Sequence, residues 1–126
     1  MRERMRRELS RGDAGHFDVK QDPGGIADIE FLAQYWALRW AREYPAVVMF
    51  ADTIRQLESV ASADLVPQSS VDVLTEAYRA YRGRAHRLSL EGVEAIVPAE
   101  EFREMRAAVT ALWEATMAAK SGVEGS

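Results

Sequence analysis

Cysteine is absent from this chain of 126 residues, and proline and histidine are scarce, with four and two copies. Without cysteine the chain can form no disulfide, no thiolate zinc site and no thiol nucleophile. The two histidines, His16 and His86, are too few for a histidine-based metal site. Four prolines and eight glycines are also too few for a disordered or linker-like chain.

Long apolar runs are missing as well, since none approaches the roughly 18 residues that a membrane helix needs. The basic N-terminus is not followed by the apolar segment of a secretory signal. The net charge of −4 argues against nucleic-acid binding as the main activity. The length fits one globular domain of about 100–150 residues. We therefore expect a soluble, cytoplasmic domain that binds neither nucleic acid nor membrane.

The N-terminal region contains two segments that a simple helical bundle does not explain. Residues 1–10 predict a short arginine-rich helix, which is either a solvated helix end or a patch facing a phosphate or a partner. Residues 16–20 alternate apolar and polar side chains, which predicts a short strand. Because no other segment predicts a strand, 16–20 is either an extended loop or pairs with strands of another domain.

Apolar spacing predicts four longer helices. The first, at 26–43, is apolar on two sides, which predicts a central position with neighbours on both flanks. Its two faces are Ile29, Leu32, Ala33, Trp36 and Trp40 on one side, and Phe31, Tyr35 and Leu38 on the other. Pro45 ends this pattern, and residues 46–50 predict a short apolar turn.

The second helix begins with Asp52 or Thr53 as its N-cap and ends near Asp64. The third begins at Ser69, where Asp72 three residues later resembles a capping box, and ends at Gly92. Its apolar residues follow steps of three and four, as in a bundle seam: Val71, Leu74, Tyr78, Tyr81, Ala85 and Leu88.

The fourth helix carries Pro98 in its first turn and loses order after Lys120. Its apolar residues repeat the same spacing: Phe102, Met105, Val109, Leu112 and Thr116. These patterns together predict an all-α fold, an antiparallel bundle of four main helices with an N-terminal arm. The expected boundaries are an arm at 1–20, a bundle at 21–120 and a flexible tail at 121–126.

The turn Asp22-Pro23-Gly24-Gly25 is the most informative local feature. Proline fixes one dihedral angle, and the glycines permit positive φ and the close approach of a backbone or ligand. The N–H groups of the following helix start can form an anion site, to which Lys20 adds a positive charge. The turn is therefore either a loop that touches a phosphate or an active-site rim, or an ordinary loop-to-helix turn.

Asp28 and Glu30 invite a metal site, but residues two apart on a helix point in nearly opposite directions. Asp28 lies in the first turn, where an acid is favoured by the helix dipole. Glu30 lies on a narrow polar strip and should have a partner, because an unpaired buried carboxylate is costly. We expect either an arginine from another helix or a place at the rim of an active site.

Basic residues surround His86 in the third helix: Arg79, Arg82, Arg84 and Arg87. This cluster is either a solvated basic face or a site for an acidic group. The three tryptophans, Trp36, Trp40 and Trp113, lie on apolar faces and are expected in the core.

The segment from Phe17 to Lys20, followed by DPGGIADIEFLAQY, resembles a signature of bacterial glutamine synthetase adenylyltransferase, also called glutamate–ammonia-ligase adenylyltransferase. In that family the signature follows the second nucleotidyltransferase domain. Further matches occur in the same order over roughly residues 2–117: 52–58, Tyr78-Arg79, Arg82, His86-Arg87-Leu88, Val97-Pro98 and Glu101-Phe102. The protein-PII uridylyltransferase shares the Pro-Gly-Gly core but usually lacks the Glu-Phe found here as Glu30-Phe31.

The resemblance implies a parent enzyme that uses ATP and Mg²⁺ to transfer AMP to a tyrosine of glutamine synthetase, under control of PII protein and glutamine. The family's catalytic Gly-Ser…Asp-x-Asp motif is absent here. We therefore expect no catalytic residue, no metal ligand and no activity in this chain alone, and residues 1–20 as a remnant of the missing catalytic domain. The residues expected to face that domain are Lys20, Asp22, Gly24, Gly25, Asp28 and Glu30.

Three functions remain open at this point. The chain is part of the adenylyltransferase, or a helical module that docks PII protein or glutamine synthetase, or a bundle with a structural role alone. In the second case the contact face is Arg79, Arg82, His86 and Arg87. The helical domain of a protein-PII uridylyltransferase is a further alternative.

Overall fold

The computed structural model describes residues 15–41 and 52–125, with residues 120–125 described by their backbone alone. The predicted helix at 1–10, its basic patch and the predicted turn at 46–50 lie outside these ranges. In the described part no helix is long and apolar enough to cross a membrane.

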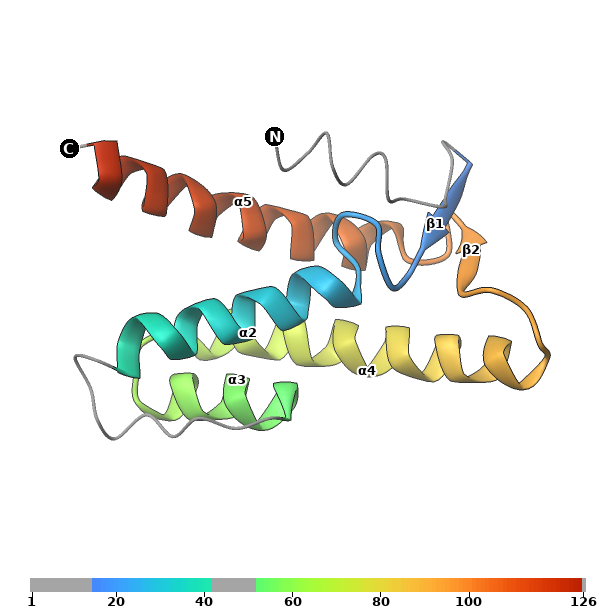
Figure 1. Ribbon diagram of the computed structural model, residues 1–126, viewed down its shortest axis with the longest axis horizontal. Helices are drawn as coiled ribbons and strands as arrows, with labels where there is room; N and C mark the ends of the chain where they lie inside the picture. The colour runs from blue at the N-terminus through green and yellow to red at the C-terminus, as the bar shows by residue number, and fades with distance from the viewer. Residues whose placement is uncertain (1–14, 42–51, 126) are drawn as a thin grey trace.

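Four helices make up most of the described chain: α2 (Ile26–Ala41), α3 (Thr53–Ser62), α4 (Gln68–Leu90) and α5 (Arg103–Gly125). Helix α4 contacts the other three and runs antiparallel to them, whereas α2 and α3 run in the same direction (Figure 1). The prediction of an all-α helical bundle is therefore confirmed.

Two short strands accompany the helices. Strand β1 (His16–Asp18) pairs antiparallel with β2 (Ile96–Pro98), and Phe17 lies opposite Val97. Both of these side chains are buried in the main core. The expectation that no other segment of this chain could pair with residues 16–20 is therefore wrong.

Strand β2 was missed because Pro98 suits the first turn of a helix. In the structure Pro98 ends β2, and α5 begins at Arg103 after a turn in which Glu101 N–H donates to the Pro98 carbonyl (3.1 Å). The missing N–H of proline does not interrupt the ladder, because Ala99 N–H donates to the Gly15 carbonyl (3.0 Å) instead.

Helix α3 begins as predicted, because the Asp52 carboxylate accepts from Arg55 N–H (3.1 Å). Helix α4 does not, since it begins at Gln68 after Pro67 and has no side-chain cap. Asp72 accepts instead from the Gln68 side chain (2.8 Å), so the predicted capping box at Ser69 is wrong. The Pro67 carbonyl accepts hydrogen bonds from the N–H groups of Ser70 and Val71 in the first turn. These two N–H groups therefore need no serine side chain as a cap.

Helix α4 ends where the sequence predicts, whereas α5 extends beyond its predicted end. Gly92 has φ +76° just after α4, which is the conformation that glycine tolerates at a helix end. Helix α5 continues to Gly125, beyond the expected end at Lys120. The division of the chain at residues 20 and 120 stays a prediction.

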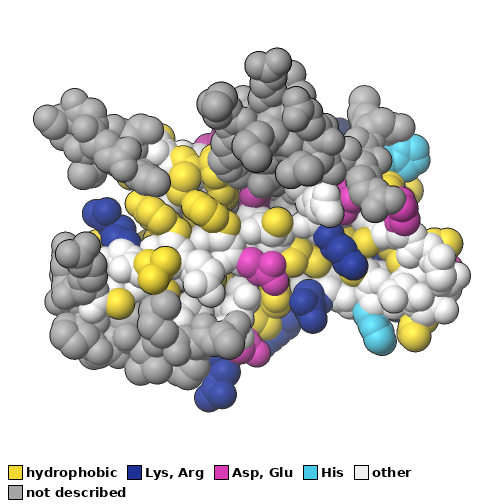
Figure 2. Space-filling view, in the orientation of Figure 1, with side chains coloured by type: hydrophobic (Ala, Val, Ile, Leu, Met, Phe, Trp, Pro, Cys, Tyr) yellow, Lys and Arg dark blue, Asp and Glu magenta, His cyan; other side chains and the backbone are white. Residues whose placement is uncertain are grey.

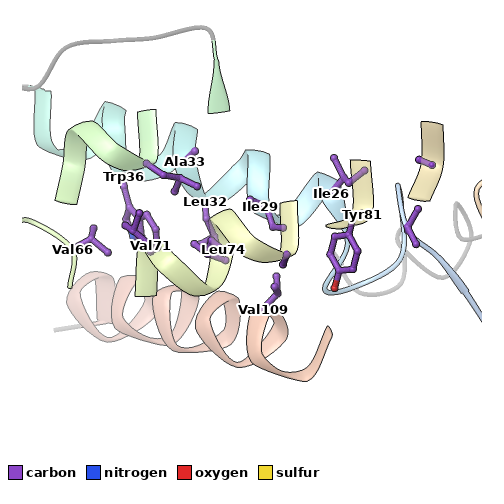
Figure 3. Packing of buried hydrophobic residues seen from close by; sticks show 14 of the residues in the cluster. Ile26, Ile29, Leu32, Ala33, Trp36, Val66, Val71, Leu74, Tyr81 and Val109 are labelled. Carbon is purple, nitrogen blue, oxygen red and sulfur yellow. The ribbon is translucent and has the colours of Figure 1, made fainter. Parts of the chain in front are cut away.

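The core lies where α4 meets the other three helices. Figure 3 shows Leu32, Leu74 and Val109 from three different helices pointing toward one another. All the seam residues predicted for α4 are buried except Tyr78, which is half-buried because Ala77 takes the inward place. The 3-4 spacing therefore located the buried face of α4 correctly.

The two apolar faces of helix α2 are buried to different extents. Its first apolar face, from Ile29 to Trp36, is buried, but Phe31 and Leu38 on the second face are 45% and 62% exposed. The predicted central position of α2 is nevertheless confirmed, because α2 lies between α5 and α3 (Figure 1) and contacts both of them as well as α4. Stacking of Phe31 on Tyr35, with ring centroids 6.2 Å apart, covers part of this face.

Tyr81 is a fully buried tyrosine whose hydroxyl has no hydrogen-bond partner in the described part of the chain. Its ring makes edge contacts with Phe17 and Phe102, at centroid distances of 5.5 and 5.1 Å. Burial raises the pKa of the Tyr81 hydroxyl, Arg106 lowers it and Asp28 raises it, with a net rise. The hydroxyl therefore adds an uncompensated polar group to the core.

Replacing Tyr81 by phenylalanine should stabilise the chain by about 1 kcal/mol at neutral pH, because it removes a buried hydroxyl that lacks a partner. Urea unfolding of the wild type and of Tyr81→Phe measures this difference. A loss of stability in the variant would mean that the hydroxyl is hydrogen-bonded in solution.

The same pair of proteins should differ in alkaline solution. Because folding raises the pKa of Tyr81, its neutral form supports stability below about pH 10, the ordinary tyrosine value, and that support is lost as the pH rises further. The wild type should therefore lose stability more steeply than Tyr81→Phe above that pH. Parallel curves for the two proteins would contradict the assignment.

Candidate functional site

The segment between β1 and α2 is closed by two aspartates. Asp18 N–H donates to the Asp22 carboxylate (2.9 Å), and Asp22 N–H donates to the Asp18 carbonyl (3.0 Å). The Asp18 carboxylate accepts from the N–H groups of Lys20 (3.0 Å) and Gln21 (3.2 Å). Both backbone groups of Asp18 are thus engaged locally, so another sheet could not extend β1 at this residue without breaking these bonds.

The two glycines of the turn are packed against protein backbone. Gly24 has φ +84°, and a Cβ there would lie 2.7 Å from three atoms of α5, two on Arg106 and one on Thr110. A Cβ on Gly25 would lie 2.6 Å from the Val19 carbonyl oxygen. The predicted close approach is therefore real, and what approaches these glycines is α5 and the end of the β1 segment.

Four consecutive N–H groups at the start of α2 form hydrogen bonds within the same segment. Gly24 donates to the Asp28 carboxylate (2.8 Å), Gly25 to the Asp22 carbonyl (2.9 Å), Ile26 to the Val19 carbonyl (2.8 Å) and Ala27 to the Lys20 carbonyl (3.1 Å). In this conformation these four amides are not available to an anion.

The acidic side chains of the turn accept hydrogen bonds from backbone N–H groups. Asp18, Asp22 and Asp28 are buried, and each accepts from a backbone N–H within four residues. Among residues 15–41 and 52–119 no three histidine, aspartate or glutamate side chains come close enough together to hold a metal ion. Lys20 differs from these aspartates, because its backbone is fixed by hydrogen bonds while the residue is exposed.

Glu30 connects α2 to α4. Its carboxylate accepts from the Tyr78 hydroxyl (3.1 Å), so among the described residues the partner of Glu30 is a tyrosine and not the expected arginine. An arginine lies next to this tyrosine, since the Arg82 guanidinium is 5.6 Å from the centroid of the Tyr78 ring. This chain of contacts joins the helix that carries the turn to the helix that carries the basic residues.

The predicted basic face lies on the outer side of α4. The exposed members are Arg79, Arg82, His86 and Arg87. Arg84 is separate, because its guanidinium forms an ion pair with Glu101 (2.6 Å) near the start of α5. The hydrogen bond from that pair raises the pKa of Arg84, while partial desolvation opposes the rise.

Arg106 on α5 is a residue of the site that the sequence did not single out. Its Nε donates to the Pro23 carbonyl (2.8 Å), and its guanidinium lies 4.4 Å from the centroid of the Phe17 ring. It therefore holds the turn and β1 against α5. The available signal was weak: Arg106 lies four residues after the apolar Phe102, on the flank of the predicted seam.

The sequence matches the family model described as GlnD PII-uridylyltransferase over residues 1–95. The chain belongs to this family. Its first four elements, through α4, fall within the matched residues, including the complete turn and the Glu30–Tyr78 contact. The matched range therefore includes both parts of the candidate site.

Curated relatives carry the name bifunctional glutamine synthetase adenylyltransferase/adenylyl-removing enzyme. The chain is 44% identical to the protein from Thioalkalivibrio sulfidiphilus and 47% identical to that from Nitrosococcus oceani, in both cases over 93% of this chain and 12% of the relative. The protein from Hahella chejuensis is 44% identical over 94% of this chain and 13% of the relative. The resemblance drawn from the signature is confirmed, and the chain spans about an eighth of these relatives' length.

Substitution of Gly24 tests the packing of the turn. Gly24→Ala should cost at least about 2–3 kcal/mol of unfolding free energy, because positive φ and the contact with α5 both oppose a Cβ. Gly92→Ala is the matched control, since Gly92 has φ +76° but no atom within 4 Å of its Cβ position, and should cost about 1–2 kcal/mol. Urea unfolding measures both, and equal losses would mean that α5 does not constrain Gly24.

Proposed function

We propose that this chain is the helical region that follows the second nucleotidyltransferase domain of a cytoplasmic glutamine synthetase adenylyltransferase. The observation that carries the proposal is identity of 44–47% over 93% of the chain to two relatives of that name. The complete protein transfers AMP from ATP to a tyrosine of glutamine synthetase, with Mg²⁺ held by its catalytic domain. The PII protein is the proposed regulatory partner of the complete protein.

In this proposal the turn supports the neighbouring catalytic domain and carries out no chemical step. Three buried aspartates are engaged with backbone N–H groups, so they are available to hold the turn and not to bind metal or nucleotide. Asp22, Gly24, Gly25 and Asp28 thus keep the turn rigid. Lys20 and Glu30 are the members whose side chains reach the surface or its edge.

Lys20 is the residue of this group best placed to contact the catalytic domain. Its N–H and its carbonyl both form hydrogen bonds within the segment, which fixes the position of the Lys20 backbone from which the side chain extends. A single exposed cation beside a nucleotidyltransferase domain can bind an acidic side chain or the triphosphate. In both cases the positive charge of Lys20 would stabilise the contact with the negatively charged group.

The chain alone should transfer no AMP. Incubation with glutamine synthetase, radiolabelled ATP and Mg²⁺ should give no incorporation above background, because the Gly-Ser…Asp-x-Asp motif is absent. The complete adenylyltransferase of a relative is the positive control. Incorporation by the isolated chain would overturn the assignment of catalysis to a separate domain.

Within a complete adenylyltransferase that carries this segment, Lys20→Ala should lower kcat/KM for adenylylation by about tenfold, the loss of one charged contact. Arg55→Ala is the matched control, since it removes one exposed cation from α3 and should leave kcat/KM unchanged. Urea unfolding of both variants checks the fold. Unchanged activity of Lys20→Ala would contradict its contact with the catalytic domain, while activity of the wild type tests the enzyme assignment separately.

A further inference from the structure

The outer side of α4 carries positive charge that the chain itself does not neutralise. Arg79, Arg82, His86 and Arg87 are exposed, and none has a carboxylate within ion-pair distance in the described ranges. Arg84 on the same helix differs from them, because its guanidinium lies 2.6 Å from the Glu101 carboxylate and forms an ion pair with it. Figure 2 shows basic side chains at several places on the face that it draws, with acidic and apolar side chains between them.

These residues form one stripe. At about 100° per residue, Arg79, Gly83, His86 and Leu90 fall within a sector of about 60°, and Arg82 and Arg87 lie about 40° outside its two edges. The stripe is about 16 Å long at 1.5 Å per residue. The cations lie along about 12 Å of this length, from Arg79 to Arg87, so they do not converge on one point as the ligands of a single phosphate would. We refer to these six residues as the α4 face.

Gly83 lies in the middle of the α4 face, and nothing in the described chain requires a glycine there. Its φ is not in the positive range, and a Cβ would meet one atom within 4 Å, an Arg87 nitrogen at 3.8 Å. A glycine inside a helix costs about 0.5–1 kcal/mol relative to alanine. Gly24, by contrast, is held by the contact with α5. The bare backbone at Gly83 is therefore an approach site for something outside the chain.

An apolar end completes the stripe. Leu90 is 75% exposed and Val93, just beyond α4, is 53% exposed. A single exposed apolar residue needs no explanation, but these two are among the four large hydrophobic side chains that are exposed in the described chain. A solvated basic face would not need them, and a nucleic acid backbone offers no apolar surface to cover them.

We propose that the α4 face binds an acidic protein surface that places a backbone or small side chain against Gly83 and an apolar side chain against Leu90. Carboxylates of that surface pair with Arg79, Arg82 and Arg87. Arginine is enriched at protein interfaces, where its planar donors bind carboxylates in a fixed geometry. Arg82 is already oriented for this by its contact with Tyr78, which lowers the entropy cost of binding. The inference is independent of the adenylyltransferase assignment.

The test uses the complete chain and two synthetic acidic helical peptides. One peptide carries glutamates with leucines along one side, and the other has alanine in place of each leucine. Changes in the amide chemical shifts of the chain locate the binding site, and fluorescence anisotropy gives Kd. Shift changes should concentrate on residues 79–93, and the leucine peptide should bind more tightly.

Four variants test the contacts. Gly83→Trp should weaken binding of the leucine peptide by about tenfold or more while α4 stays folded, because the added side chain has room to project outward. The double variant Arg79→Glu/Arg87→Glu should weaken both peptides. Leu90→Ser should weaken the leucine peptide alone. Arg55→Glu on α3 reverses one exposed charge outside the α4 face and, as a control, should change Kd by less than about twofold.

Several results would overturn the proposal. Failure of both peptides to bind, shift changes spread over other helices, or equal binding by wild type and Gly83→Trp would each mean that the α4 face is a solvated basic surface. Self-association of the chain that Arg79→Glu/Arg87→Glu abolishes would replace the acidic partner by a second copy. Tighter binding of single-stranded RNA than of the leucine peptide at the same face would assign it to a polyanion.

Discussion

The contact between the backbone of Gly24 and helix α5 is the constraint on which much of the arrangement depends. A Cβ at this position would lie 2.7 Å from atoms of Arg106 and Thr110, so the turn can approach α5 this closely with glycine alone. Arg106 then reaches the Pro23 carbonyl and the Phe17 ring from the same helix. A single approach of two backbones thus joins β1, the turn, the start of α2 and α5 in one unit.

The close approach of the turn to α5 explains why the signature contains several aspartates. A turn pressed between a strand and a helix has backbone N–H groups that water cannot reach, and each needs an acceptor. Asp18, Asp22 and Asp28 supply these acceptors. These aspartates of the signature therefore have a structural role in the turn, while Lys20 and the basic residues of the α4 face are exposed.

The sequence predicted those features that depend on neighbours a few residues away. The seam of α4, the Asp52 cap and the end of α4 at Gly92 follow from helical spacing and local conformation. Strand β2 did not, because three residues carry too little pattern and its partner β1 lies far away in the chain. The Glu30–Tyr78 bond and the role of Arg106 were also out of reach, since both depend on how α2 and α5 pack.

The same packing links the two surfaces that remain exposed. Glu30 follows Asp28 by half a turn on α2, so a helix start fixed by Asp28 also fixes where the Glu30 carboxylate lies. That carboxylate holds the Tyr78 hydroxyl, and the Tyr78 ring in turn lies beside Arg82. A continuous series of contacts therefore connects the turn to the α4 face. The link from Glu30 to Tyr78 is a hydrogen bond between two helices, whereas the link from Tyr78 to Arg82 is a contact between a ring and an exposed guanidinium on the same helix, so the second link can change without breaking the first.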